Sequence, residues 1–234
     1  GVLIGDALGV PYEFKSRETM NSYPAKDMVG FGTHNQPEGT FSDDGSLTLC
    51  LADSLISKGY DIDDLCQKVI QWHDNGYWGA HQQVFDIGIA THVAIKKLKN
   101  EVHPSMAGGI NENDNGNGSL MRILPLLLIL LPIKSRIERF KIVKEVSSIT
   151  HAHIRSIIAC FYYLEFALYL AQKEDKVTIY DRLKSEIPAF LSQENISQNE
   201  INRFERLLKG NIGELNVDAI QGNGYVVSTL EASI

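Results

Sequence analysis

The sequence predicts an all-α protein that folds as one multi-helix domain across residues 1–234. Apolar residues recur at helical spacing along most of the chain, and alternating strand patterns are almost absent. Polar, glycine-rich loops separate the helical stretches. The stretch Gly224-Tyr-Val-Val is too short to change the fold class. A chain of this length can bury one sizeable core.

In the first half of the chain, apolar spacing and capping residues predict the helices. The opening residues are apolar and helical in character, and they turn at a glycine and a proline. Segment 47–57 is apolar on most sides, which predicts a buried helix. Segment 61–74 has a single apolar stripe and begins at Asp61 or Asp63, both good N-caps. Segment 85–100 repeats the stripe.

In the second half, the longest apolar run is interrupted by Pro125 and Pro132. It covers residues 123–133, too few to span a bilayer, and predicts a buried helix or a helix and turn. Helical spacing predicts further helices at 119–131, 137–150, 155–173, 178–187 and 200–208. The loops where we expect a site to assemble are 30–45, 75–82, 107–118 and 209–224.

Composition excludes several classes of function. The net charge of −7 and the lack of a Lys/Arg cluster argue against a nucleic-acid surface. Cys50, Cys66 and Cys160 are scattered, so we expect reduced core thiols in a cytoplasmic protein and no cysteine-bound zinc. We expect neither a membrane partner nor a signal peptide. Both ends stop within helical patterns without caps, so we expect both to be clipped.

A hydroxyl and two consecutive carboxylates, Ser42, Asp43 and Asp44, stand where a glycine-bearing loop enters a helix. Oxygen ligands of this kind suit a hard divalent cation such as magnesium. The alternative is structural, because Ser42 is a good N-cap and acidic residues favour the positive end of a helix.

A second candidate site is the polar loop from Gly108 to Arg122, which leads into an apolar segment. Its small residues would let backbone amides approach an anion such as a diphosphate. The alternative is a flexible Asn/Gly turn, and the loop lacks the Gly-Lys-Ser/Thr ending of a Walker A motif.

Single acids and histidines complete the candidates. Glu13 lies between Tyr12 and Phe14, where apolar surroundings would raise its pKa for proton transfer; the alternative is a solvated side chain beside a turn. Asp86 is a candidate helix cap. His151 and His153 would share a face only in a strand, and their flanks look helical, which argues against a metal site.

Together these residues resemble the ADP-ribosylglycohydrolase family, which includes dinitrogenase-reductase-activating glycohydrolases and ADP-ribosyl-acceptor hydrolases. Five blocks match in the same order, and a sixth, the last one below, looks like the family's late Gly-Tyr-Val-Val segment, so that the resemblance spans nearly the whole chain. They are Gly5-Asp-Ala-Leu-Gly-Val-Pro-Tyr-Glu13, Ser42-Asp-Asp44, Phe85-Asp-Ile-Gly88, Gly116-Asn-Gly-Ser-Leu-Met-Arg122, Thr150-His151 and Gly224-Tyr-Val-Val-Ser-Thr-Leu-Glu-Ala232.

The resemblance implies an all-α fold with a binuclear magnesium centre in a cleft, with Mn²⁺ as a possible substitute. It implies metal ligands at Ser42, Asp43 and Asp44. It assigns catalysis to Glu13 and Asp44, with the choice of general base left open. The implied substrate contacts are Asp86, Gly116, Asn117, Gly118, Ser119, Met121, His151 and Tyr225.

The implied reaction is hydrolysis of the N- or O-glycosidic bond of an ADP-ribosylated protein or small conjugate, releasing ADP-ribose. The transition state would resemble an oxocarbenium ion. The sequence names neither the acceptor group nor the oligomeric state.

Three departures from the family pattern favour an alternative reading. Residues 1–234 lack the family's late Asp-x-Asp-Thr ligands, Gly45 replaces a common Thr, and Ser228 replaces a frequent Asp. We therefore expect a chain truncated at its C-terminus, or else a non-catalytic relative that binds ADP-ribose or serves a structural, crystallin-like role.

Overall fold

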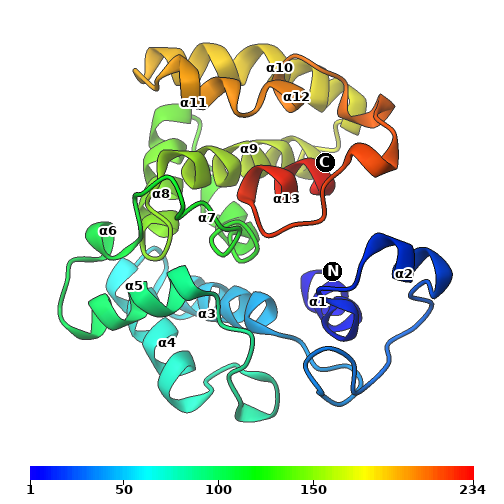
Figure 1. The fold of residues 1–234 in the computed structure, drawn as a ribbon. Coiled ribbons are helices and arrows are strands. Elements are labelled where there is room, and N and C mark those ends of the chain that lie inside the picture. Colours follow the sequence, from blue (N-terminus) through cyan, green and yellow to red (C-terminus); the bar gives the residue numbers. More distant parts are fainter.

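Thirteen α-helices and five short 3₁₀ turns make up the chain in a computed structural model that describes all 234 residues, and no strand is present. The all-α prediction is confirmed (Figure 1). The helices are α1 (Val2–Gly9), α2 (Arg17–Ser22), α3 (Asp43–Lys58), α4 (Ile62–Asn75), α5 (Ile89–Lys99), α6 (Pro104–Ala107), α7 (Leu127–Leu130), α8 (Arg136–Ser148), α9 (Ile154–Ala171), α10 (Lys176–Gln193), α11 (Gln198–Asn202), α12 (Glu205–Leu208) and α13 (Val226–Ser233). The 3₁₀ turns are η1 (Val10–Tyr12), η2 (Ala80–Gln82), η3 (Leu124–Leu126), η4 (Ile212–Glu214) and η5 (Val217–Ala219).

Helix α9 is the centre of the core. It packs against α7, α8, α10 and α13, and most of its residues are buried. By length and composition α9 could cross a membrane, but 67% of it is buried inside the protein. Because a core helix passes the same test, this is weak evidence for a membrane span. In Figure 1, α10 to α12 lie on one side of α9, and α3 to α5 lie on the other.

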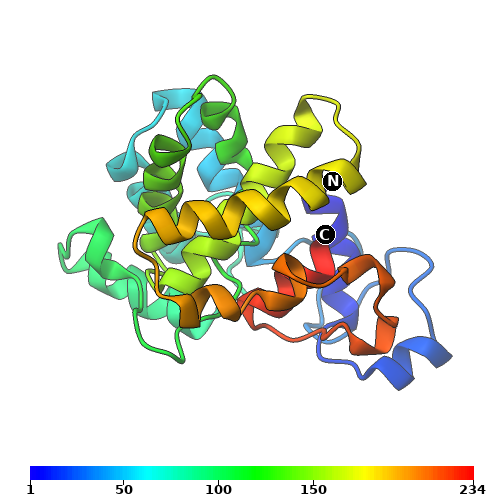
Figure 2. The same cartoon turned by 90° about the horizontal axis from the view of Figure 1, so that it is seen from above.

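Helices α3 and α4 form a second packed pair, and α1 packs on α3. Leu47 is completely buried and Trp72 almost so, as their apolar spacing predicts. Helix α3 ends at Gly59, whose φ of 74° suits glycine. Figure 2 shows α2 (blue) at one edge of the molecule.

Several predicted helix boundaries are wrong. Helix α3 begins at Asp43 because Ser42 caps it by accepting a hydrogen bond from the Asp44 amide. Residues 85–88 are not helical: α5 begins after Gly88, and Asp86 has a φ of 55°, so Asp86 is not the helix cap. The predicted helix 119–131 begins as turn, and only η3 and α7, over residues 124–130, are helical.

Two of the later predicted helices also differ in extent from the observed ones. Helix α10 continues past its predicted end with Pro188 inside it. The segment predicted as one helix at 200–208 is split into α11 and α12. Cys50, Cys66 and Cys160 are free and buried, as expected for core thiols.

A buried ion pair joins α8 to α9. The Glu165 side chain is 1% exposed and receives two hydrogen bonds from Arg139, at 2.5 and 2.8 Å. The Arg136 guanidinium donates to Glu165 at 3.0 Å and also pairs with Glu186 of α10. Arg136 of α8 therefore links α9 and α10 through two different carboxylates, Glu165 and Glu186.

We expect Glu165→Gln to lower the free energy of unfolding by about 3–5 kcal/mol, because it leaves the buried Arg139 cation without its counter-charge. Urea denaturation measures the change. As a control, Asp181→Asn removes an exposed ion pair with Lys184 and should leave the midpoint unchanged. Equal midpoints for wild type and Glu165→Gln would contradict this assignment.

Candidate active site

Four acidic side chains from three separate segments line one cavity of about 840 Å³. Glu13 follows η1, Asp43 and Asp44 open α3, and Asp86 lies in the loop before α5. Glycine-rich segments around 116–118 and 222–224 line the same cavity. The cleft therefore has an acidic wall and a wall rich in glycine.

Asp6 of α1 fixes the acidic wall. Its carboxylate accepts hydrogen bonds from the Ser42 amide (2.9 Å), the Ser42 hydroxyl (2.8 Å) and the Gly45 amide (2.7 Å). A Cβ at Gly45 would lie 2.8 Å from the Asp6 carboxylate and 2.7 Å from the Phe41 ring. Glycine at position 45 is therefore what allows α1 to approach the start of α3.

The acidic wall carries little compensating charge. Burial, followed by repulsion from Asp44, raises the pKa of Asp43 to about 9. Burial, followed by repulsion from Asp6 and Glu13, raises the pKa of Asp44 to about 7. Burial also raises the pKa of Glu13. Adjacent buried carboxylates whose charge is so poorly compensated fit a hard divalent cation, which prefers oxygen ligands.

The glycine wall is held by backbone pairing. Gly116 forms an isolated antiparallel bridge with Tyr225, the Asn117 amide donates to Gly224 (3.0 Å), and the Val226 amide donates to Asn115 (3.0 Å). The two loops are thus joined before any ligand arrives. Small residues there leave backbone groups accessible from the cleft.

His151 stands directly behind the glycine wall. A Cβ at Gly118 would lie 2.6 Å from His151 Cε1, and one at Gly116 would lie 3.5 Å from Nε2. Burial lowers the pKa of His151 to about 4, so the ring is neutral at pH 7. Thr150 Oγ1 accepts from Arg122 (2.8 Å) and lies 2.9 Å from His151 Nδ1, so the Thr150 hydroxyl links the two side chains.

Comparison with known proteins shows which family the chain belongs to. The family model described as ADP-ribosylglycohydrolase matches residues 1–234. The chain belongs to the ADP-ribosylglycohydrolase family.

Relatives of the family share moderate identity with the chain. It is 30% identical to the ADP-ribosylarginine hydrolase Tri1 of Pseudomonas putida (strain GB-1), covering all of this chain and 58% of that protein. It is 30% identical over 163 residues to the ADP-ribosyl-[dinitrogen reductase] glycohydrolase of Rhodospirillum rubrum, covering 68% of this chain and 52% of that protein. The chain thus spans somewhat more than half the length of these relatives.

A solved structure agrees with the fold. A chain of an "ADP-ribosylglycohydrolase-related protein complex" superposes with a TM-score of 0.74 at 25% identity. The alignment covers all of this chain and 71% of that chain.

In this ADP-ribosylglycohydrolase-family chain, most of the predicted site residues share the cleft. Those that line it are Glu13, Asp43, Asp44, Asp86, Gly116, Asn117, Gly118, Met121 and His151. Ser42 is buried behind the acids, where its hydroxyl bonds Asp6. These placements fit the predicted roles without testing them.

Two predicted substrate contacts lie outside the cleft lining. The Ser119 side chain is completely buried and receives a hydrogen bond from Ser147 (3.0 Å), so its hydroxyl faces the core. The Tyr225 ring is half-buried beside Arg155, with the guanidinium 5.9 Å from the ring centroid. The Tyr225 backbone, rather than its ring, pairs with Gly116 of the glycine wall.

The second histidine of the pair does not join the cleft. His153 caps α9, with Nδ1 accepting from the Arg155 amide (3.2 Å). Glu112 and Glu200 lie near it, but both pair with the Arg155 guanidinium, at 3.0 and 2.8 Å. This group is an ion-pair network whose carboxylates already have a cationic partner.

Sequence analysis missed His34, which lies in the long segment between α2 and α3. Its Nε2 contacts the Glu13 carboxylate and lies 3.8 Å from Asp86 Oδ1. No local pattern around His34 signals this role, because its partners are distant in sequence.

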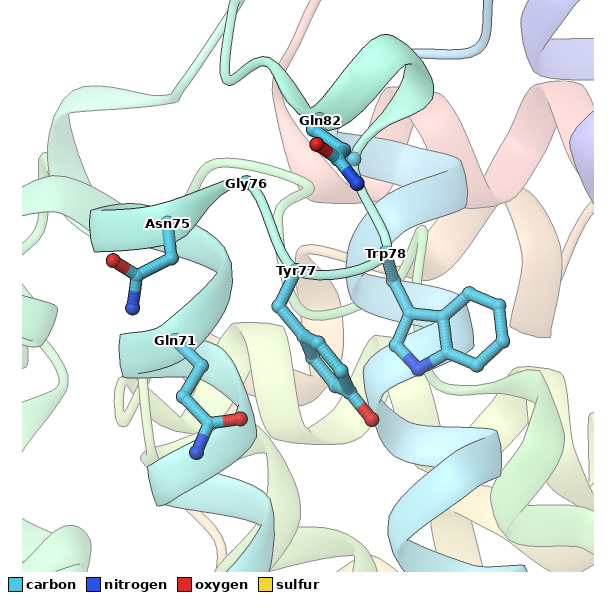
Figure 3. Close-up of a pocket in the computed structure, with 7 residues that line it drawn as sticks. Gln71, Asn75, Gly76, Tyr77, Trp78 and Gln82 are labelled. Atoms are coloured by element: carbon cyan, nitrogen blue, oxygen red, sulfur yellow. The ribbon is translucent and has the colours of Figure 1, made fainter.

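A second cavity of about 440 Å³ lies beside the loop after α4. Figure 3 shows Tyr77 and Trp78 extending from this loop, with Gln71 and Asn75 on the neighbouring helix. Tyr77 and Trp78 both donate to Asp53, at 2.5 and 3.1 Å, which fixes both rings. None of the predicted site residues lines this cavity.

The raised pKa of Asp43 predicts a stabilising substitution. Relative to its ordinary pKa of 3.8, this group stabilises the fold fully below pH 3.8 and loses that contribution as pH rises toward 9. Asp43 makes no side-chain hydrogen bond. In chelator at pH 9, Asp43→Asn should therefore raise Tm by at least about 3 °C, the equivalent of about 1 kcal/mol.

Differential scanning calorimetry at pH 9 and pH 4 measures this effect. The gain should nearly vanish at pH 4, where the folded carboxyl is protonated and the unfolded carboxyl is only about half ionised. A variant less stable than wild type at both pH values would contradict the assigned burial cost.

Proposed function

We propose that this chain forms the cleft of a magnesium-dependent hydrolase that cleaves the glycosidic bond of ADP-ribosylated substrates and releases ADP-ribose. The single observation that carries the proposal is the cleft itself, in which poorly compensated carboxylates face a preformed glycine-rich backbone wall. The family match over the whole chain supports the same reaction class.

Arginine is the proposed acceptor. The support comes from the relatives in Pseudomonas putida and Serratia proteamaculans, each described as an ADP-ribosylarginine hydrolase and each 30% identical to this chain. The acidic wall is also compatible with a guanidinium leaving group, since negative charge favours a bound cation.

Ser42, Asp43 and Asp44 are the proposed metal-holding residues. A bound divalent cation would supply positive charge that polarises oxygen atoms of the substrate or water. A bound cation would favour the ionised forms of Asp43 and Asp44, whose pKa values burial raises. Manganese has the same ligand preference.

Glu13 is the proposed general base. Its raised pKa brings it closer to neutral pH, where a carboxylate accepts protons more effectively. His34 contacts Oε2, so Oε1 is left to take the proton from the attacking water. Water would bond to ribose C1″ as the bond to the acceptor nitrogen breaks, and the leaving group would gain a proton.

The glycine wall is the proposed holder of the diphosphate. Backbone N–H groups of a glycine-rich loop approach phosphate oxygens closely because no side chain intervenes. The His151 ring lies directly behind the same loop. Asp86 would contact the ribose or the leaving group.

One observation favours a second candidate function. Every carboxylate that lines the cleft comes from the first 86 residues, and none comes from residues 87–234. A cleft with ligands on one side only would hold ADP-ribose without turning it over. Binding of ADP-ribose without release of product would support this reader function.

We expect this chain to release ADP-ribose from an arginine-ADP-ribosylated protein with magnesium present, and not with chelator. Asp44→Asn should lower the release rate by at least about 100-fold, because it removes a proposed metal ligand. Chromatographic assay of free ADP-ribose measures the rate. Asp63→Asn, an exposed acid of α4, is the matched control. Full activity of Asp44→Asn with unchanged folding would refute the metal-holding role.

We expect Gly118→Ala to weaken ADP-ribose binding about tenfold, because the added methyl group would displace the His151 ring or the loop. Isothermal titration calorimetry measures Kd. Gly222→Ala is a matched control in the same cleft, since a Cβ there meets no atom within 4 Å. Equal weakening by both substitutions would contradict a specific role for the Gly118–His151 contact.

A further inference from the structure

His34 joins two acids of the cleft that come from different segments. Its Nε2 contacts Oε2 of Glu13 and lies 3.8 Å from Oδ1 of Asp86. The His34 side chain is 14% exposed, and the two carboxylates are 36% and 22% exposed. The contact therefore lies at the wall of the cleft and is partly shielded from water.

The backbone holds the segment of His34 against the segment of Glu13. The Thr33 amide donates to Pro11 O (3.2 Å), and the Thr33 hydroxyl donates to Glu13 O (2.7 Å). A Cβ at Gly32 would lie 2.2 Å from Pro11 O, so only glycine permits this approach. The imidazole is thus brought to Glu13 by its own neighbours in the chain.

Aromatic rings fix the imidazole from two sides. The Phe14 ring centroid is 5.9 Å and the Phe85 ring centroid 5.5 Å from that of His34. Phe14 and Asp86 both have left-handed backbone conformations, with φ of 60° and 55°. Such conformations cluster at functional sites, where the surrounding structure holds them in place.

Charge gives this contact its importance. Among the acids that line the cleft, only Glu13 and Asp86 have a basic side chain within 4 Å, and in both cases it is His34. Lys15 also lines the cavity but pairs with none of these acids. Without the imidazole, Glu13 and Asp86 would face each other with no donor between them.

We propose that His34 is a positioning residue, which holds the Glu13 carboxylate through Oε2 beside Asp86 and leaves Oε1 directed to the reacting water. This inference rests on the proposed function, since Glu13 is the proposed general base. His34 itself bonds to neither substrate nor metal in this assignment. Its loss would allow Glu13 to rotate away.

The test compares steady-state kinetics of His34→Ala, His34→Gly and His34→Gln with wild type on an arginine-ADP-ribosylated protein. We expect kcat of His34→Ala to fall about 10- to 100-fold with KM changed by less than about threefold, as for loss of a group that orients a base. His34→Gln should retain part of kcat, because its amide can donate to Glu13.

Added imidazole should restore part of kcat in His34→Gly, which a merely structural loss would not allow. His103→Ala, an exposed cap of α6, is the matched control and should behave as wild type. Unchanged kcat in His34→Ala overturns the proposal. So does a loss that neither imidazole nor His34→Gln restores.

A nitrogen NMR measurement separates this inference from the proposed function. If the wild-type chain releases no ADP-ribose, the proposed function fails. The imidazole resonances of His34 then show whether His34 contacts Glu13 in solution. Glu13→Gln should shift His34 Nε2, whereas Asp63→Asn should not. A His34 Nε2 resonance that Glu13→Gln leaves unmoved overturns the inference.

Discussion

The geometry of the cleft depends on the hydrogen bonds that the Asp6 carboxylate accepts. Its three hydrogen bonds to the start of α3 hold α1 against the helix that presents Asp43 and Asp44. The chain runs from α1 through η1 to Glu13, so the same hydrogen bonds help to determine where Glu13 lies. A helix N-terminus stabilises a carboxylate, which allows the half-buried Asp6 to support the start of α3.

The acidic wall is kept at a cost in stability. Burial and mutual repulsion raise the pKa values of Asp43 and Asp44 far above their ordinary range. A protein selected for stability alone would not retain such a pair, and strained charges of this kind are typical of functional sites. The one partner in reach, His34, contacts Glu13 and Asp86 rather than the most deeply buried pair.

The opposite wall explains why isolated backbone pairs occur in an all-α fold. Gly116 pairs with Tyr225, and Gly109 pairs with His151, each as a single bridge between distant loops. These pairs satisfy backbone groups that a loop would otherwise leave to water. They also bring the Gly118 backbone within contact of the His151 ring. The loops are therefore ordered surfaces, organised before a ligand binds.

The sequence by itself determined the all-α class, most of the extent of helices α3, α4, α8 and α9, and the presence of acids at the start of α3. It could do so because apolar periodicity and helix capping are local signals. Only the tertiary structure decided where Asp86 lies, which way Ser119 points, and that His34 meets Glu13. These features depend on contacts between residues distant in the chain. Packing, rather than any nearby pattern, selects such contacts, so no local reading of the sequence could supply them.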